Sequence, residues 1–127
     1  MTRYFVAAAV FAVASGFAPA AGPPSAITVR DGMFADSLGM TLYTTDGDRT
    51  PNASSCYDNC VHNWPALNAA DSDRDDGDWN VILREDGTRQ WAYKGKPVYR
   101  FILDRNPGDV KGDGVGNVWH AIRIRER

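Results

Sequence analysis

The chain has 127 residues, with 14 basic and 16 acidic side chains and a formal net charge of −2. A mildly acidic composition with mixed charges argues against nucleic acid or an anionic membrane surface as a partner, because both require a basic patch. The length is that of one ordinary domain, and two domains are not expected.

The first twenty residues are typical of a secretory signal peptide. Their single charge is Arg3, which precedes an apolar run over 4–17 and the small-residue sequence Ala18-Pro19-Ala20. A signal peptidase accepts a site of this form, so we expect cleavage near Ala20. The apolar run is too short for a comfortable membrane span, and no second such run follows it. We therefore expect a soluble mature chain, secreted or periplasmic, with no membrane span.

The cysteines bear on both anchoring and redox state. A lipid anchor needs a cysteine at the cleavage point, whereas the cysteines are Cys56 and Cys60, so we expect no lipid anchor. The mature chain 21–127 loses only Arg3, which leaves 13 basic against 16 acidic residues and a net charge of −3. Export places both cysteines in an oxidising compartment, where a pair normally forms a disulfide.

The sequence aligns with itself at an offset of 55 or 56 residues, which indicates an internal duplication. Four matched blocks occur in the same order: Arg30-Asp31-Gly32 with Asp86-Gly87, Gly39–Tyr43 with Gly95–Tyr99, Asp48–Pro51 with Asp104–Pro107, and Trp64–Leu67 with Trp119–Ile122. We expect a first repeat over about 27–70, an exposed acidic linker over about 71–78 and a second repeat over about 79–127. The three segments together form a single β domain.

Within the first repeat, turn and helix signals stand out. Asp31-Gly32, like Asp86-Gly87 in the second repeat, is the dipeptide of a type I′ hairpin turn. Residues 55–63 are the only candidate helix, capped by Ser54 or Ser55 and ended by Trp64-Pro65.

The second repeat predicts a three-strand meander. Trp79, Val81 and Leu83 alternate with polar neighbours before the turn, 90–93 returns after it, and 94–97 turns the chain into a strand over 98–103. Residues 106–117, rich in glycine, predict a long loop. The segment 119–125 predicts a last strand with His120, Ile122 and Ile124 on one face.

These elements predict a mostly β fold with at most one short helix. Three or four short strands cannot bury their apolar face alone. We therefore expect the two tandem β-meander repeats to pack together as one pseudo-twofold sandwich or partly open barrel.

A Tyr-x4-Asp motif occurs in both repeats, as Tyr43 to Asp48 and as Tyr99 to Asp104. With the Gly-x-x-x-Tyr sequences before it, the cysteine pair and Trp64-Pro65, the chain resembles the family called secreted repeat of unknown function, also described as predicted lipoproteins with this tandem motif. The resemblance covers about 29–119 and implies an envelope location and a fold. It implies no particular activity.

The phenol and carboxylate of the motif could face a ligand, but we favour a structural interpretation. Tyr43 and Tyr99 would pack in their strands, while Asp48 and Asp104 would accept backbone N–H groups in the turns that follow. Recurrence in both repeats supports this interpretation, because an active site is usually assembled once whereas each repeat needs its own turn.

The cysteine pair leaves several hypotheses open. A structural disulfide between Cys56 and Cys60 is the favoured one. Haem attachment needs Cys-x2-Cys-His, which this spacing does not match, and a redox dithiol is usually found in a βαβ context. A copper site could use Cys56, Cys60 and His62, with His120 as another candidate ligand.

Calcium has two weak candidate sites. Asp71, Asp73 and Asp75 have the spacing of an EF-hand loop, but Asp76 replaces the required glycine and Ile82 replaces the final glutamate. Asp104, Asp109 and Asp113 lie together in the second repeat. No cofactor is predicted, with copper or calcium as the alternatives.

No catalytic motif of the serine-hydrolase, phosphate-loop or zinc-protease type is present in the sequence. We expect an exported envelope protein that acts as a non-catalytic binding or accessory module, with an envelope protein or a small ligand as its partner. The alternatives are a periplasmic copper-binding or redox accessory protein using Cys56 and Cys60, and a small hydrolytic enzyme; the sequence does not decide whether the chain is an enzyme.

Overall fold

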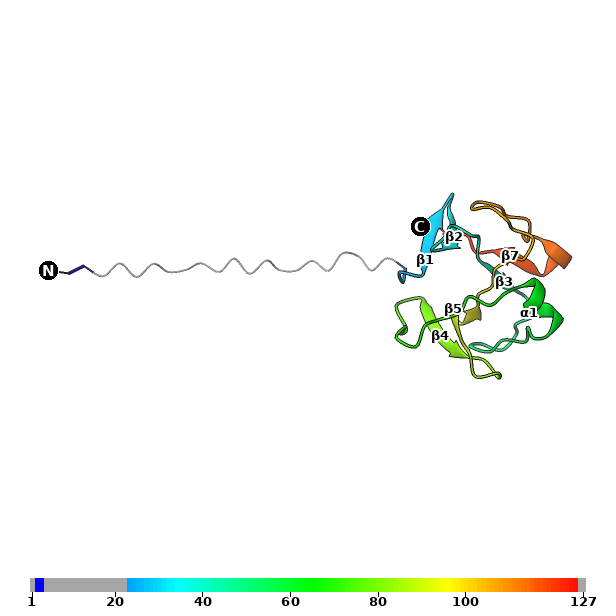
Figure 1. The fold of residues 1–127 in the computed structure, drawn as a ribbon, viewed down its shortest axis with the longest axis horizontal. Helices are drawn as coiled ribbons and strands as arrows, with labels where there is room; N and C mark the ends of the chain where they lie inside the picture. The colour runs from blue at the N-terminus through cyan, green and yellow to red at the C-terminus, as the bar shows by residue number, and fades with distance from the viewer. Residues whose placement is uncertain (1, 4–22, 126–127) are drawn as a thin grey trace.

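The computed structural model describes residues 2–3 and 23–125, so the expected signal peptide falls almost wholly outside the described residues. Within these residues the chain forms seven short strands and two short helical segments (Figure 1). Their bounds are β1 Ile27–Arg30, β2 Met33–Asp36, β3 Tyr43–Thr45, α1 Asn59–Asn63, β4 Trp79–Leu83, β5 Arg89–Tyr93, β6 Lys96–Pro97, η1 Val115–Asn117 and β7 Trp119–Ala121. The mostly β prediction is confirmed.

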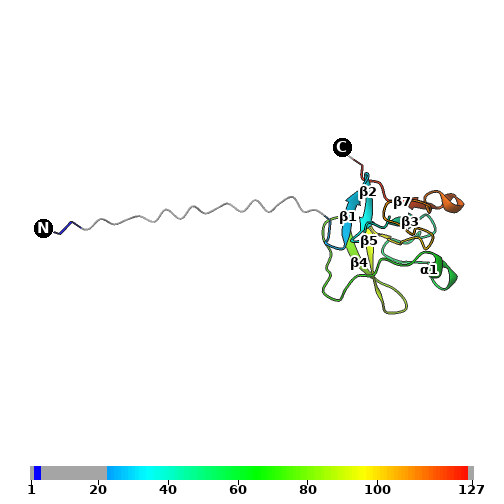
Figure 2. The ribbon, with the colours of Figure 1, turned by 45° about the horizontal axis from the view of Figure 1, so that its top comes forward.

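Each repeat contributes one hairpin at the same end of the molecule, where Figures 1 and 2 both place β1–β2 beside β4–β5. The first hairpin has Arg30 opposite Met33, and both Asp31 and Gly32 have a positive φ, as a type I′ turn requires. The prediction for this turn is confirmed.

The second hairpin differs from the prediction. Only Gly87 has a positive φ in the Asp86-Gly87 pair, the Gly87 N–H donates to the Arg84 carbonyl, and the Arg84 N–H donates to the Thr88 carbonyl. This is a type I turn closed by a left-handed glycine, the usual form of a three-residue hairpin loop. The Asp86 carboxylate stabilises it by accepting the Thr88 N–H and hydroxyl.

The two repeats exchange strands rather than folding side by side. Strand β3 of the first repeat pairs with β7 of the second, with Tyr43 opposite Ala121. In the equivalent contact, Tyr99 of the second repeat pairs with Ala66 of the first. Tyr43 and Tyr99 meet in the middle, where each donates its backbone N–H to the other's carbonyl, at 2.8 and 2.9 Å.

Further backbone pairs follow the same rule. The Leu67 N–H donates to Val98 of the other repeat, and the equivalent Ile122 N–H donates to Leu42. Reciprocal contacts of this kind are those of an approximate twofold axis, which passes between Tyr43 and Tyr99. The two repeats therefore share their hydrogen-bonded structure.

In the described residues, two apolar cores lie on either side of the strands that the repeats exchange. The first core fills the hairpin end, and the second lies toward α1 and β7. The members of the first are Ile27, Phe34, Leu42, Leu67, Trp79, Trp91, Val98 and Ile122; those of the second are Tyr43, Cys56, Trp64, Ala66, Tyr99, Trp119 and Ala121. Because both sets draw on both repeats, neither repeat has a core of its own.

An aromatic stack joins the repeats in the second core. The rings of Trp64 and Trp119, which are equivalent in the two repeats, stack with their centroids 3.7 Å apart and their planes 1° apart. The other face of Trp64 lies against Phe101, at 4.1 Å. Stacked aromatic pairs add stabilisation to that of the area they bury.

The last strand does not show the predicted alternation. Ala121 and Ile122 are both buried, whereas His120 is exposed, so His120 and Ile122 do not share a face. The chain crosses between the two cores at this point, with Ala121 in the second and Ile122 in the first. The regular strand therefore ends at Ala121 instead of continuing to 125.

The remaining predicted elements are shorter than expected. The strand predicted over 98–103 is reduced to the two isolated bridges of Tyr99, with Tyr43 and with Ala66, while β6 falls within the turn predicted over 94–97. The predicted helix over 55–63 is only α1, which begins at Asn59 without a capping side chain. The acidic linker is exposed, and the glycine-rich stretch is a loop containing η1, as predicted.

Candidate functional site

The polar groups of the repeated motif are hydrogen-bonded across the twofold axis. The Tyr43 hydroxyl donates to Oδ2 of Asp104 at 2.5 Å, and the Tyr99 hydroxyl donates to Oδ2 of Asp48 at 2.7 Å. Each tyrosine thus binds the aspartate of the other repeat. All four residues are buried, with exposed fractions of 0% for the tyrosines and 6% for the aspartates.

The second carboxylate oxygen of each aspartate accepts a backbone N–H seven residues further along. Oδ1 of Asp48 accepts the Ser55 N–H and hydroxyl, each at 2.7 Å, and Oδ1 of Asp104 accepts the Lys111 N–H at 2.9 Å. Each carboxylate therefore fixes the loop after its own turn while holding the tyrosine of the other repeat.

The phenols are neutral donors in this arrangement. Burial is the main cause that raises the pKa of Tyr43 and of Tyr99 well above the usual range of a phenol, and the neighbouring Asp104 and Asp48 add to it. A phenol with such a raised pKa keeps its proton at neutral pH, so neither tyrosine is available as a base or nucleophile.

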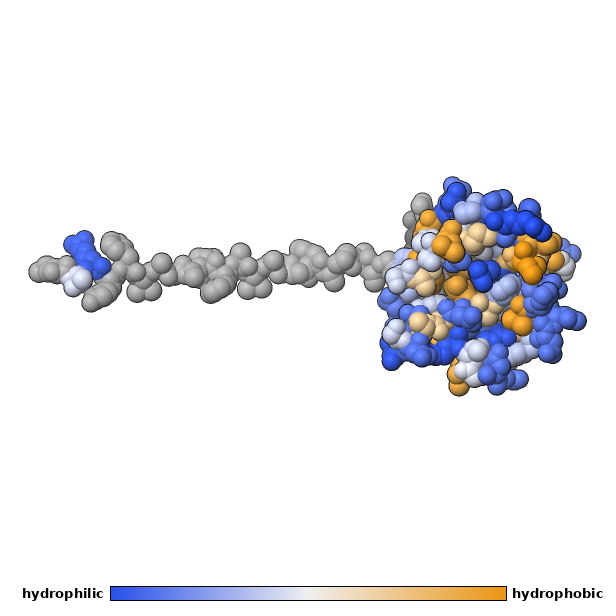
Figure 3. All heavy atoms as spheres, viewed as in Figure 1, coloured by the Kyte–Doolittle hydropathy of each residue, from blue (hydrophilic) through white to orange (hydrophobic). Residues whose placement is uncertain are grey.

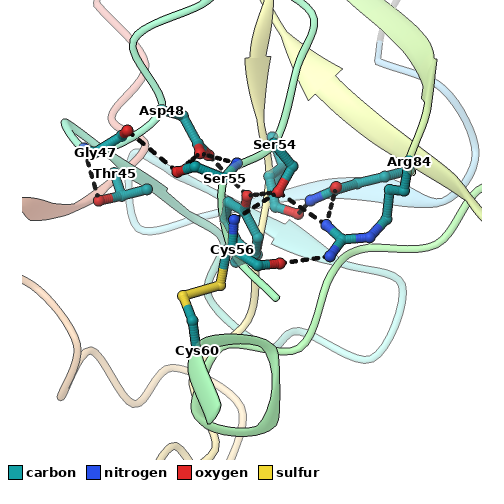
Figure 4. Close-up of a disulfide and its surroundings, with 11 residues drawn as sticks. Thr45, Gly47, Asp48, Ser54, Ser55, Cys56, Cys60 and Arg84 are labelled. Carbon is teal, nitrogen blue, oxygen red and sulfur yellow. Dashed lines mark hydrogen bonds between the residues drawn. A yellow bond between two sulfur atoms is a disulfide. The ribbon is translucent and has the colours of Figure 1, made fainter. Parts of the chain in front are cut away.

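A buried arginine extends the network on the Tyr99 side (Figure 4). The Ser54 hydroxyl lies 2.6 Å from the Tyr99 hydroxyl, and the Arg84 guanidinium donates to Ser54 at 3.0 Å, to Oε1 of Gln90 at 2.7 Å and to the Cys56 carbonyl at 2.5 Å. Arg84 is only 3% exposed. The guanidinium is therefore connected to the Asp48 carboxylate through the hydroxyl groups of Ser54 and Tyr99.

The Tyr43 side lacks this polar chain. The residue equivalent to Ser54 is Val110, at an offset of 56. The Phe34 N–H donates to Ile122 and the Trp91 N–H donates to the equivalent Leu67, so this stretch aligns at an offset of 57 and the residue equivalent to Gln90 is Met33. Val110 and Met33 are both apolar and pack on the second core. There the Tyr43 hydroxyl instead accepts the Gly112 N–H, at 3.2 Å. The twofold relation thus holds for the Tyr–Asp pairs and not for their surroundings.

Cys56 and Cys60 form a disulfide, with their Cα atoms 5.2 Å apart (Figure 4). Cys56 is buried, and Cys60 lies half-buried in α1. Residues 54–56 bind Tyr99, Asp48 and Arg84 in turn, so the loop that the bridge closes begins at the last of the residues that hold the buried network. In this state neither cysteine offers the thiolate that copper would require.

Removing the bridge tests its structural role. The Cys56→Ser, Cys60→Ser double variant is expected to fold with a melting temperature lower by about 10 °C, because a five-residue loop contributes roughly 2 kcal/mol of stability. Calorimetry and bound-copper analysis of the variant and the parent measure this. Free thiols in the exported parent, or copper bound by the parent and lost in the variant, contradict the structural role.

The other candidate ligand sets are dispersed. His62 is exposed on α1, and His120 lies 2.9 Å from Asp46 on the surface. Asp109 and Asp113, like Asp104, accept neighbouring backbone N–H groups through their own carboxylates. Among the residues that the structure describes, no group of three or more histidine, cysteine or acidic side chains converges on a point.

A groove between the repeats was not predicted from the sequence. It consists of two adjoining cavities of about 290 and 410 Å³, and both are lined by Phe34, Asp78 and Tyr93. Phe34 comes from the first repeat and Tyr93 from the second. Only the alternation of apolar residues in β4 and β5 marked this region in the sequence, and alternation does not show which strands meet.

The architecture is that of an intertwined two-repeat protein held by exchanged Tyr–Asp pairs. Comparison with known families identifies both repeats: the family described as secreted repeat of unknown function matches residues 25–68 and 80–123. The chain belongs to this family, which is secreted. No curated protein and no solved structure matches the chain. Within the described part of the chain, no helix is long and apolar enough to cross a membrane.

Proposed function

We propose that the protein is a non-catalytic binding module of the cell envelope, released in soluble form after signal cleavage near Ala20. The observation that carries this proposal is the use of the motif's polar groups. Both phenols and both carboxylates are bound to each other and to the backbone inside the protein, so their recurrence is explained by folding. On this proposal, the residues that bind a partner lie on the surface.

The surface and the restrained core beneath it support this proposal. Figure 3 shows a face that is largely hydrophilic, with separate apolar patches. The exchange of strands, the aromatic stack and the disulfide all restrain the core beneath it. A rigid scaffold binds with little loss of conformational entropy, which favours recognition by a preformed site.

Native mass spectrometry of the protein purified from its own envelope tests this function. We expect a retained small molecule or protein partner and no stoichiometric copper. Detection of a covalent intermediate that turns over favours the hydrolase instead. Copper retained by the parent and lost in the Cys56→Ser, Cys60→Ser variant favours the copper protein.

The same sample tests the processing step. The small-residue sequence ending at Ala20 predicts a mature chain that begins at Ala21 and partitions with soluble envelope proteins. N-terminal sequencing and fractionation measure this. Retention of residues 1–20, or recovery in the membrane fraction, contradicts it.

A further inference from the structure

The groove between the repeats has an aromatic wall. Phe34 of β2 packs edge-on against Trp79 of β4, with centroids 5.1 Å apart, and Tyr93 of β5 lies 5.1 Å from Phe34 and 4.9 Å from Trp79. Phe34 and Trp79 are nearly buried, whereas Tyr93 is half-buried. The wall is therefore fixed from behind by the first core and presents mainly Tyr93.

Charges of opposite sign occupy the two ends of the groove. Asp76 and Asp78 line the cavity of about 290 Å³, and no basic side chain of the described residues lines it. Lys94, Arg123 and Arg125 line the adjoining cavity of about 410 Å³, with Asp78 at the junction. The groove thus runs from an acidic end, past aromatic rings, to a basic end.

Most of these charges have no ion-pair partner within residues 2–3 and 23–125. Arg123 is held by Asp113, with Nη2 2.8 Å from Oδ2. None of the ion pairs in that part of the chain includes Asp76, Asp78, Lys94 or Arg125. Asp76, Asp78 and Arg125 are available to a ligand, as is Lys94, whose Nζ lies 5.3 Å from the centroid of the Tyr93 ring, while Arg123 is already neutralised.

We propose that this groove binds a short peptide of two or three residues with a free amino end and a free carboxyl end. The ammonium group pairs with Asp76 and Asp78, an apolar side chain packs on Phe34 and Tyr93, and the carboxylate pairs with Lys94 and Arg125. Each cavity is of a size that suits a small ligand. This proposal rests on the proposed function and names the ligand class of the binding module.

The chemistry of the lining discriminates against other ligands. A nucleotide or other polyanion meets Asp76 and Asp78 at one end, and a polycation meets Lys94 and Arg125 at the other. Like charges brought together in this way raise the free energy of the complex. A zwitterion with an apolar middle matches all three parts of the groove.

The test is a titration of the mature protein with the tripeptide Ala-Phe-Ala, followed by NMR amide shifts. We expect saturable binding in the high-micromolar to millimolar range, with the largest shifts at Asp78, Tyr93 and Lys94. Acetylating the amino end or amidating the carboxyl end should each weaken binding at least fivefold.

Matched charge variants locate the site. Asp78→Asn and Arg125→Gln should each weaken tripeptide binding at least fivefold, whereas Asp58→Asn and Arg105→Gln, which alter exposed charges away from the groove, should leave it unchanged. All four variants are expected to keep the melting temperature of the parent, since the altered side chains are exposed.

The proposal is overturned if the blocked tripeptides bind as well as the free one, if shifts lie away from the groove, or if no saturable binding occurs. The binding-module function fails separately. If the protein retains a native ligand and Asp78→Asn and Arg125→Gln retain it equally, the groove assignment is wrong and the module function stands. If neither tripeptide nor native ligand binds, both are wrong.

Discussion

Replacing Arg84 with methionine is expected to lower the free energy of unfolding by about 3–5 kcal/mol. The guanidinium serves three acceptors at once: the Ser54 hydroxyl, Oε1 of Gln90 and the Cys56 carbonyl. Methionine has a similar length and no donors, so it fills the space but leaves Oε1 of Gln90 and the Cys56 carbonyl buried without a partner, and it removes one of the hydrogen bonds of Ser54. An unsatisfied buried polar group costs about 1–3 kcal/mol.

The loss should extend to the motif itself. Ser54 links Arg84 to Tyr99, and Tyr99 donates to the carboxylate of Asp48. Without the guanidinium, the Asp48 carboxylate has no buried positive charge connected to it through hydrogen bonds. Lysine keeps the charge, but its single ammonium group does not reproduce the planar fork of donors. Arg84→Lys is therefore expected to recover only part of the stability.

Urea unfolding of the parent and its variants measures the effect. Arg105→Met is the matched control, because Arg105 is exposed, and its unfolding free energy should stay within about 0.5 kcal/mol of the parent. The double variant Arg84→Met, Gln90→Leu should lose less than the two single variants added together, since it removes an acceptor along with its donor. A loss below 1 kcal/mol for Arg84→Met shows that the network is not stabilising.

The sequence predicted the duplication because the matched blocks survive in both repeats. It did not show that Tyr43 binds Asp104 rather than Asp48. An alignment of two repeats is satisfied equally by pairs within a repeat and by pairs exchanged between repeats. The choice depends on where the strand after each turn pairs, and that pairing joins distant residues: Ala66 with Tyr99 and Tyr43 with Ala121.

Hydrogen bonds of the serine side chains explain why α1 is shorter than the predicted helix over 55–63. Ser54 and Ser55 have the composition of helix caps, but their hydroxyl groups bind Tyr99 and Asp48 instead. The chain then runs without helical structure from Ser55 to Asp58, and α1 begins at Asn59. The local capping signal could not show this, because the groups that bind the two serine hydroxyls, Tyr99 and Asp48, lie outside the predicted helix.

The groove was missed for a similar reason. Phe34 and Tyr93 belong to hairpins of different repeats, and their neighbours in sequence are those of ordinary half-buried strands. Charged residues near them look like solvated turn residues in the sequence. Only the packing of β2 against the β4–β5 hairpin brings the aromatic rings and both sets of charges to one surface.

Replacing Gly112 with alanine is the second substitution expected to have a large effect. A Cβ atom at this position would lie 2.8 Å from Cη2 and Cζ3 of Trp64 and 2.9 Å from Cε1 of Tyr43. Contacts this short require the rings to move. Trp64 has little room to do so, because its ring is stacked between Trp119 at 3.7 Å and Phe101 at 4.1 Å.

The displacement should also weaken the motif. The Gly112 N–H donates to the Tyr43 hydroxyl, which itself donates to Asp104. Moving the backbone away from the rings lengthens the first of these bonds, and moving Tyr43 disturbs the second. Forcing an additional methyl group into a packed core costs about 1–3 kcal/mol, and we expect the upper part of that range here.

Gly47→Ala is the matched control for this substitution. Neither glycine has a positive φ, so alanine is compatible with the backbone at both positions, and the nearest atom to a Cβ at Gly47 is Oγ1 of Thr45, at an ordinary 3.5 Å. Urea unfolding followed by near-ultraviolet circular dichroism of the tryptophans should show a loss of about 2–3 kcal/mol for Gly112→Ala and less than 0.5 kcal/mol for Gly47→Ala.

Both repeats should unfold in one transition, because the Trp64–Trp119 stack and the exchanged strands belong to both. Equal stability of the two variants would refute the close packing of Gly112 on Trp64, and two separate transitions would refute the shared core.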